Sequence, residues 1–179
     1  RDIDSIMERT KNRPIPSKKI DPSEALTFGV ILSFISIIIL GLAVNWFSSL
    51  LLAFTIIFYA VIYTVLLKRS TIQNIVIGGA SGAFPPVIGY SMIDGNISVE
   101  ALLLFGIIFL WTPPHFWALA LLRQNEYKLA NIPMLPVVHG NKTTRKYILY
   151  YVLLLLPFSM LPFALGYLSL IYLSTSVIL

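Results

Sequence analysis

The sequence contains no cysteine and few charged residues. Without cysteine, neither a disulfide framework nor a thiolate metal site can form. Only 12% of the 179 residues are charged and 57% are hydrophobic, whereas soluble domains carry roughly 25% charged residues. The mean hydropathy is +0.83. This composition excludes an ordinary soluble domain and indicates a membrane protein.

Five apolar stretches are long enough to cross a bilayer as helices, which takes about 20 residues each. They are residues 25–44, 46–67, 75–93, 99–122 and 147–173. We therefore expect an all-α, polytopic transmembrane helix bundle that forms a single membrane domain over residues 1–179. The first two stretches meet so closely at Asn45 that they should form an antiparallel hairpin.

Small residues and prolines mark the third and fourth stretches. Gly78, Gly79 and Gly82 predict close contacts between helix backbones. The pair Pro113-Pro114 predicts an interruption of the fourth stretch.

All thirteen Lys and Arg residues lie in three polar segments, residues 1–24, 68–74 and 123–146. The turns at Asn45 and at 94–98 contain none. Under the positive-inside rule, this alternation places residues 1–24 and the second long loop, 123–146, on the cytoplasmic side and Leu179 outside. We expect a multi-pass protein of a prokaryotic cell membrane. Because topology accounts for the basic residues, the net charge of +5 gives no reason to expect nucleic-acid binding.

The opening stretch, RDIDSIMERTKNRPIP, mixes acids with bases. If residues 1–13 form a helix, Asp4 and Glu8 lie one turn apart, as do Arg9 and Arg13. Such a cluster suits a Mg²⁺-bound diphosphate, since Mg²⁺ takes one or two carboxylates plus phosphate oxygens and Arg binds phosphate bidentately. An ion-paired helix end is the alternative.

A second cluster lies in WTPPHFWALALLRQNEYKLANIPMLPVVHG. In one continuous helix, His115 and Glu126 would share a face, with His115 at depth and Glu126 at the cytoplasmic mouth. A histidine inside a membrane usually faces the bundle interior or a cavity. It would therefore bond to a neighbouring helix, ligate a metal or contact a polar substrate. Arg123 and the pair Lys68-Arg69 are either topology charges or phosphate ligands.

Several motifs resemble those of the UbiA-type intramembrane prenyltransferases, and most closely those of the haem O synthase (protohaem IX farnesyltransferase) family. The opening RDIDSIMERTKNRP is similar to the end of N-D-x-x-D-x-x-x-D followed by R-T-x-x-R-P, with Asp4 as the last aspartate. The segments YTVLLKRST, WTPPHFWALA and IPMLPVV match three further motifs; they begin at Tyr63, Trp111 and Ile132. The resemblance implies a bundle of about nine helices. Because the sequence begins in a charged segment without an initiator Met, we expect an internal fragment of it.

The resemblance also implies a reaction: transfer of a farnesyl group from farnesyl diphosphate to a vinyl group of haem B, with Mg²⁺ as cofactor. The implied catalytic residues are Asp4, Arg9, Arg13, Lys68 and Arg69. The implied substrate-binding residues are Arg123, Glu126, Tyr127 and His115, with Asp4 and Glu126 as metal ligands. The family usually has Asp-Tyr where this chain has Glu126-Tyr127, so Glu126 could act through a bridging water.

The implied partners are farnesyl diphosphate, haem B, the lipid bilayer and haem-copper oxidase assembly factors. A quinone precursor or another lipid is the alternative acceptor. A transporter is a further alternative, although its ionisable residues would be expected near the midplane and here they gather at one membrane face.

Overall fold

The computed structural model describes residues 2–178, which form helices joined by turns and loops and contain no strand over that range. Five segments are long and apolar enough to cross a membrane, which confirms the expected fold class. They are α2 (Pro22–Ala43), α3 (Trp46–Ile57) continued by the π-helix η1 (Phe58–Leu67), α4 (Asn74–Asp94), α5 (Val99–Leu122) and α7 (Leu135–Ala164). Three short helices complete this part of the chain: α1 (Asp2–Ile6), α6 (Gln124–Leu129) and α8 (Leu170–Ile178).

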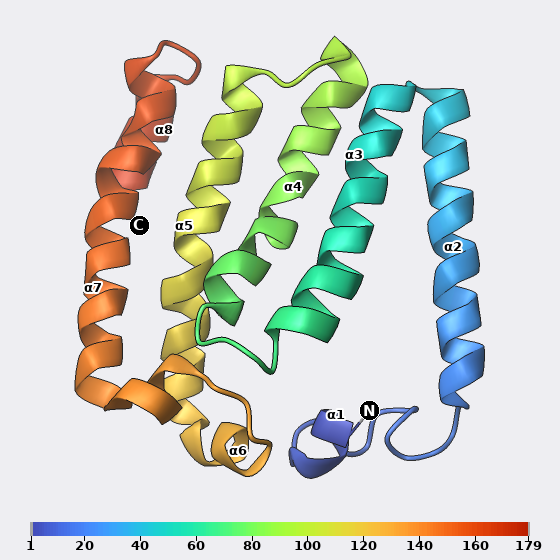
Figure 1. Ribbon diagram of the computed structural model, residues 1–179. Coiled ribbons are helices and arrows are strands. Elements are labelled where there is room, and N and C mark those ends of the chain that lie inside the picture. Colours follow the sequence, from blue (N-terminus) through green and yellow to red (C-terminus); the bar gives the residue numbers. More distant parts are fainter. Residues whose placement is uncertain (1, 179) are drawn as a thin grey trace.

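The long helices stand side by side in chain order, with all three basic segments at one end (Figure 1). The turns at Asn45 and Gly95 lie at the opposite end. Asn45 accepts a hydrogen bond from the Ser48 N–H at 2.8 Å and donates one to the Ser91 carbonyl at 3.0 Å. Asn45 therefore both caps α3 and ties the expected α2–α3 hairpin to the end of α4.

The opening helix is shorter than expected, because α1 ends at Ile6 and the following residues form turns. Thr10 is 1% exposed and donates its hydroxyl to the Asp4 carbonyl at 2.9 Å. This bond satisfies a carbonyl that the helix end leaves free. The expectation of one helix over residues 1–13 is wrong, yet the turns bring Arg13 back to Asp4, with Nη1 3.5 Å from Oδ2.

Helix α5 ends at Leu122, where the fourth apolar stretch was expected to end, but it does not continue to Glu126. Arg123 adopts φ −122° and ψ 28°, which ends the helix one residue earlier and starts the separate helix α6. Glu126 belongs to α6, so the expectation that His115 and Glu126 share one helix face is wrong.

The Pro113-Pro114 pair does not interrupt α5, contrary to expectation. Both prolines are buried, and α5 packs against α4 on one side and α7 on the other. Neighbouring helices allow membrane helices to tolerate proline.

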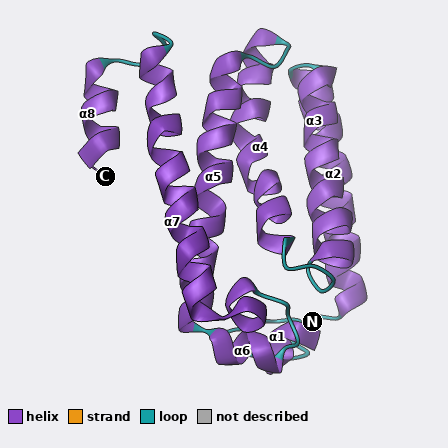
Figure 2. Ribbon diagram, turned by 60° about the vertical axis from the view of Figure 1, so that its left-hand side comes forward, coloured by secondary structure: helices purple, strands orange, loops and turns teal. Residues whose placement is uncertain are grey.

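The fifth span lies earlier in the chain than residues 147–173. Gly140, at φ 77° and ψ 170°, breaks α7 into a short helix that begins at Leu135 and a long helix that ends at Ala164. Gly166, two residues after this end, adopts a left-handed φ of 79°. The N–H groups of the two residues after Gly166 both bond to the Pro162 carbonyl and close the helix end. The chain then reverses, and α8 packs beside α7 (Figure 2). Leu179, expected on the outer side, lies outside the described residues.

Candidate functional site

A polar pocket opens at the end of the bundle where α1, η1, α4 and α6 meet, with a volume of about 250 Å³. Five of the residues expected in the site line it: Asp4, Arg9, Arg13, Lys68 and Tyr127. Figure 2 shows α1 and α6 close together beneath the long helices. Three cationic side chains and one carboxylate leave the lining net positive, which suits a polyanion.

The ion pair between Asp4 and Arg13 contributes little to stability. Their side chains are 31% and 53% exposed, and the two groups are 3.5 Å apart. Exposed pairs of this kind contribute only about 0–1 kcal/mol because water screens them. Both groups thus remain accessible from the pocket.

Tyr127 brings a neutral hydrogen-bond donor to the pocket from α6. Burial raises the pKa of Tyr127, and the nearby Arg9 and Arg123 oppose that shift only in part. The phenol therefore keeps its proton at neutral pH.

The π-helix η1 places Tyr63 and Lys68 on one face. The Lys68 N–H bonds to the Tyr63 carbonyl at 2.8 Å, five residues back. Five residues turn through about 500° in an α-helix, which would put Lys68 about 140° away from Tyr63. In a π-helix they lie one turn apart, so both line the polar pocket.

Two of the three glycines in α4 permit the close contacts that the sequence predicts. A Cβ at Gly78 would lie 2.3 Å from the Tyr63 ring, and a Cβ at Gly79 would lie 3.0 Å from Thr112. Gly82 differs, because no heavy atom lies within 4 Å of its Cβ position. The expectation of close packing is wrong for Gly82.

An apolar cavity of about 370 Å³ continues from the polar pocket along α4, between η1 and α5. The two share Tyr59, Tyr63, Ile75 and Phe116. Further along, its lining consists mainly of small and apolar residues: Gly78, Gly79, Ser81, Gly82, Ile108, Trp111 and Thr112. The combination can hold an amphipathic molecule with an anionic head and a hydrocarbon tail.

Asn74, which sequence reasoning missed, is buried at 1% exposure and lines the polar pocket. Its Nδ2 donates to the Lys68 carbonyl at 3.2 Å, while its Oδ1 has no hydrogen-bond partner among the described residues. An unpaired buried acceptor costs about 1–3 kcal/mol and often marks the place of a ligand or ion. The sequence signal was the amide pair Gln73-Asn74 between a basic pair and an apolar span.

A hydrophobic cluster fixes the base of the pocket. The extended segment between α6 and α7 contributes Ile132 and Met134, which pack against Ile75 and Trp117 and also line the pocket. The Ile132 N–H bonds to the Tyr127 carbonyl at 3.0 Å. The IPMLPVV motif thus joins the pocket base to the long helices.

Four of the expected site residues do not line the polar pocket. Arg123 and Glu126 line a separate hollow at the end of α5, and Glu126 Oε2 is buried without a hydrogen-bond partner among the described residues. Arg69 is exposed in the turn before α4. His115 is also exposed and stacks on Trp111, with ring centroids 4.2 Å apart.

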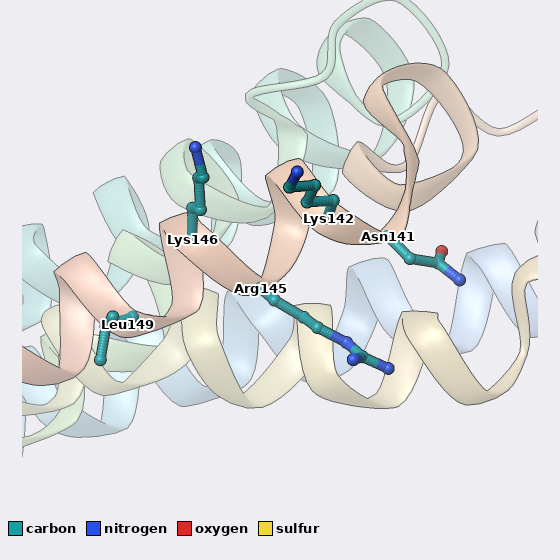
Figure 3. A pocket seen from close by; sticks show the side chains of 5 residues that line it. All are labelled: Asn141, Lys142, Arg145, Lys146 and Leu149. Carbon is teal, nitrogen blue, oxygen red and sulfur yellow. The ribbon is translucent and has the colours of Figure 1, made fainter.

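A larger hollow of about 510 Å³ lies along the first turns of α7 and is lined by Asn141, Lys142, Arg145, Lys146 and Leu149. Figure 3 shows Lys142 and Lys146 pointing to one side of the helix and Arg145 to another. Because these cations do not converge on one point, the polar pocket is the stronger candidate site.

The polar pocket suits Mg²⁺ only together with a ligand that brings its own oxygen atoms. Residues 3–178 contain no group of three or more His, Asp and Glu side chains that could hold a metal ion. Among the described lining residues, Asp4 is the one carboxylate. Mg²⁺ commonly binds through one or two carboxylates, with substrate phosphates and water as the other ligands. Asp4 therefore fits a Mg²⁺ ion that is bound with a diphosphate.

Comparison with known proteins gives a consistent set of matches. The model of the UbiA prenyltransferase family matches residues 1–179. The chain is 57% identical to "Protoheme IX farnesyltransferase" of Methylobacterium radiotolerans, covering 96% of the chain and 54% of the relative. It is 54% identical to the protein of the same name from Brucella anthropi, covering 99% and 57%. The chain thus spans about half the length of these relatives, and no solved structure matches it.

Proposed function

Because the chain belongs to the UbiA prenyltransferase family, we propose that it is part of an integral-membrane enzyme that transfers a farnesyl group from farnesyl diphosphate to haem B, yielding haem O and diphosphate. The relatives named for protohaem IX farnesyl transfer support this choice of donor and acceptor. The family and the five apolar helices make the chain a multi-pass membrane protein. The positive-inside rule favours a site on the cytoplasmic side.

The observation that carries the proposal is the junction of a cationic pocket with an apolar cavity. The two share four lining residues, so a single molecule can place a diphosphate in one and a prenyl chain in the other. A soluble anion would use only the polar pocket.

Cationic side chains of the polar pocket would assist departure of the diphosphate. When the bond between the farnesyl C1 and its oxygen breaks, the electron pair leaves with diphosphate, and negative charge builds on that oxygen. Arg9, Arg13 and Lys68 line the pocket and would stabilise this charge, as preorganised donors do in other transition states. Asp4 would hold Mg²⁺, which supplies further charge neutralisation when bound. Arg69, Arg123 and Glu126 would act from the rim of the site.

Aromatic rings would stabilise the positive charge that develops on the allylic carbon. Tyr59, Tyr63 and Phe116 line both the pocket and the cavity, so they surround the position expected for C1, and cations are attracted to ring faces. C1 then bonds to the terminal vinyl carbon of haem B. Water adds a hydroxyl to the neighbouring carbon and releases its remaining proton to solvent or diphosphate.

The test is to incubate the full-length protein in detergent with farnesyl diphosphate, Mg²⁺ and haem B and to measure product mass. We expect haem O, in which the vinyl group has become a hydroxyethylfarnesyl group. Prenylation of a quinone precursor, with none of haem B, would establish the alternative acceptor. No transfer to either would contradict the proposal. Co-purification with haem-copper oxidase assembly factors would test the expected partners.

His115 is the proposed contact for haem B. It is exposed on α5 and lines neither the polar pocket nor the apolar cavity. We expect His115→Ala to weaken haem B binding about tenfold or more, because the loss of one hydrogen bond to a charged group has an effect of that size. The affinity for farnesyl diphosphate should stay unchanged. Haem titration and diphosphate binding on the same purified variant measure both.

His139 provides the matched control for this experiment. It is the chain's other histidine, is exposed on α7, and lines none of the cavities described above. His139→Ala should leave both affinities at the wild-type value. Equal weakening of both substrates by His115→Ala would instead assign His115 to structural stability.

A further inference from the structure

The apolar cavity extends beyond the position expected for the reacting carbon of a diphosphate bound in the polar pocket. A third hollow of about 370 Å³ follows it, lined by Thr55, Ile56, Tyr59, Ala60, Ser81 and Gly82. It shares Tyr59, Ser81 and Gly82 with the apolar cavity. The polar pocket, the apolar cavity and this third hollow therefore form one run of space along α4. The unpaired buried oxygen of Asn74 lies at its polar end.

Gly82 lies where the apolar cavity meets the third hollow. Ile75, Gly78 and Gly82 follow helical spacing on one face of α4, and all three line the apolar cavity. Gly82 is about 10 Å further along the axis than Ile75, at 1.5 Å per residue. A prenyl chain with its diphosphate in the polar pocket would reach Gly82 with its distal units, away from the reacting carbon.

The space at Gly82 is not required for helix packing. No heavy atom lies within 4 Å of its Cβ position, in contrast to Gly78 beneath Tyr63. A methyl group at position 82 would therefore enter the cavity without displacing a neighbour, and a larger side chain would extend further into the same space. We propose that Gly82 determines the length of prenyl chain that this enzyme accepts, an inference that rests on the proposed function.

The experiment compares geranyl, farnesyl and geranylgeranyl diphosphate as donors to haem B for the full-length wild type and Gly82→Phe. We expect Gly82→Phe to shift the ratio of kcat/KM for geranyl over farnesyl diphosphate upward by about tenfold or more, as loss of apolar space typically does. Inhibition by inorganic diphosphate should stay unchanged, because that group binds in the polar pocket. Gly82→Ala should give a smaller shift in the same direction.

Gly89→Phe is the matched control. Gly89 is also in α4, is exposed, and has no heavy atom within 4 Å of its Cβ position, but it lines none of the described cavities. The donor preference of Gly89→Phe should equal that of the wild type. Ala60→Phe enters the same hollow from η1 and should repeat the shift, which keeps the test decisive if Gly82→Phe does not fold.

The outcomes separate the two proposals. An unchanged donor ratio in Gly82→Phe, or in both Gly82→Ala and Ala60→Phe if Gly82→Phe does not fold, would overturn the role of Gly82 and leave the proposed function standing as long as transfer is intact. An equal shift in Gly89→Phe would also overturn it, since that residue lies away from the cavities. Failure of the wild type to transfer any prenyl group would contradict the proposed function itself.

Discussion

Asp4→Asn in the full-length enzyme is expected to reduce turnover at least about 100-fold while leaving the protein folded. Asp4 is the one carboxylate among the described residues that line the polar pocket. Removing its charge would weaken Mg²⁺ and diphosphate binding together, and changes around a metal ligand alone typically cost 10- to 100-fold. The fold should survive, because the lost ion pair with Arg13 is partly exposed and contributes about 1 kcal/mol or less.

Turnover, thermal unfolding and Mg²⁺-dependent binding of inorganic diphosphate should be measured on the same preparation. Glu8→Gln is the control, since it removes a carboxylate from the same segment. Glu8 is 77% exposed and pairs with Lys11 at 2.5 Å, away from the pocket lining. Near-normal turnover and diphosphate binding in Asp4→Asn would contradict this prediction and would indicate that the charges of the opening segment only set the membrane topology.

Gly78→Ala is expected to damage both stability and activity through Tyr63. The new Cβ would lie 2.3 Å from the Tyr63 ring, so the ring or one of the two helices must move. Overpacking of this kind costs about 1–3 kcal/mol. Because Tyr63 lines both the polar pocket and the apolar cavity, we also expect kcat/KM for farnesyl diphosphate to fall about tenfold or more.

The control for Gly78→Ala is Gly89→Ala in the same helix, where the added methyl meets no atom within 4 Å. Alanine is intrinsically favoured over glycine in helices by about 1 kcal/mol, so Gly89→Ala should equal or exceed the wild type in thermal stability. Wild-type stability and kcat/KM in Gly78→Ala would contradict the prediction, because they would show that neither quantity depends on the position of the Tyr63 ring over α4.

The features that the sequence predicts correctly depend on local composition. Apolar length alone identifies five spans and, for the first four, their approximate bounds, because any helix in a bilayer needs an apolar surface of fixed length. The separation of basic segments from turns that lack Lys and Arg predicts that the three polar segments share one end, as they do (Figure 1). The opening motif also identifies Asp4, Arg9 and Arg13 as a group before their contacts are known, and these three do line one pocket.

Two of the expectations that failed depend on where helices end. Sequence periodicity extended one helix from His115 to Glu126, but Arg123 leaves the helical conformation. The same periodicity continued the opening helix past Ile6. In the structure, the Thr10 hydroxyl instead donates a hydrogen bond to the Asp4 carbonyl. A side-chain cap competes with the next helical hydrogen bond by only about 1 kcal/mol, a difference too small to read from residue types.

By itself, then, the sequence determined a helical membrane protein, its spans, the shared end of its charges and the motifs of a prenyltransferase. Only the tertiary structure decided how the charged end becomes a site. The π-winding of η1 turns Lys68 toward Tyr63, and Gly78 lets that ring rest on α4. Gly82, identical in type, instead leaves open space. The physical reason is that a glycine specifies only a missing side chain, and the neighbouring helix decides whether that space is filled.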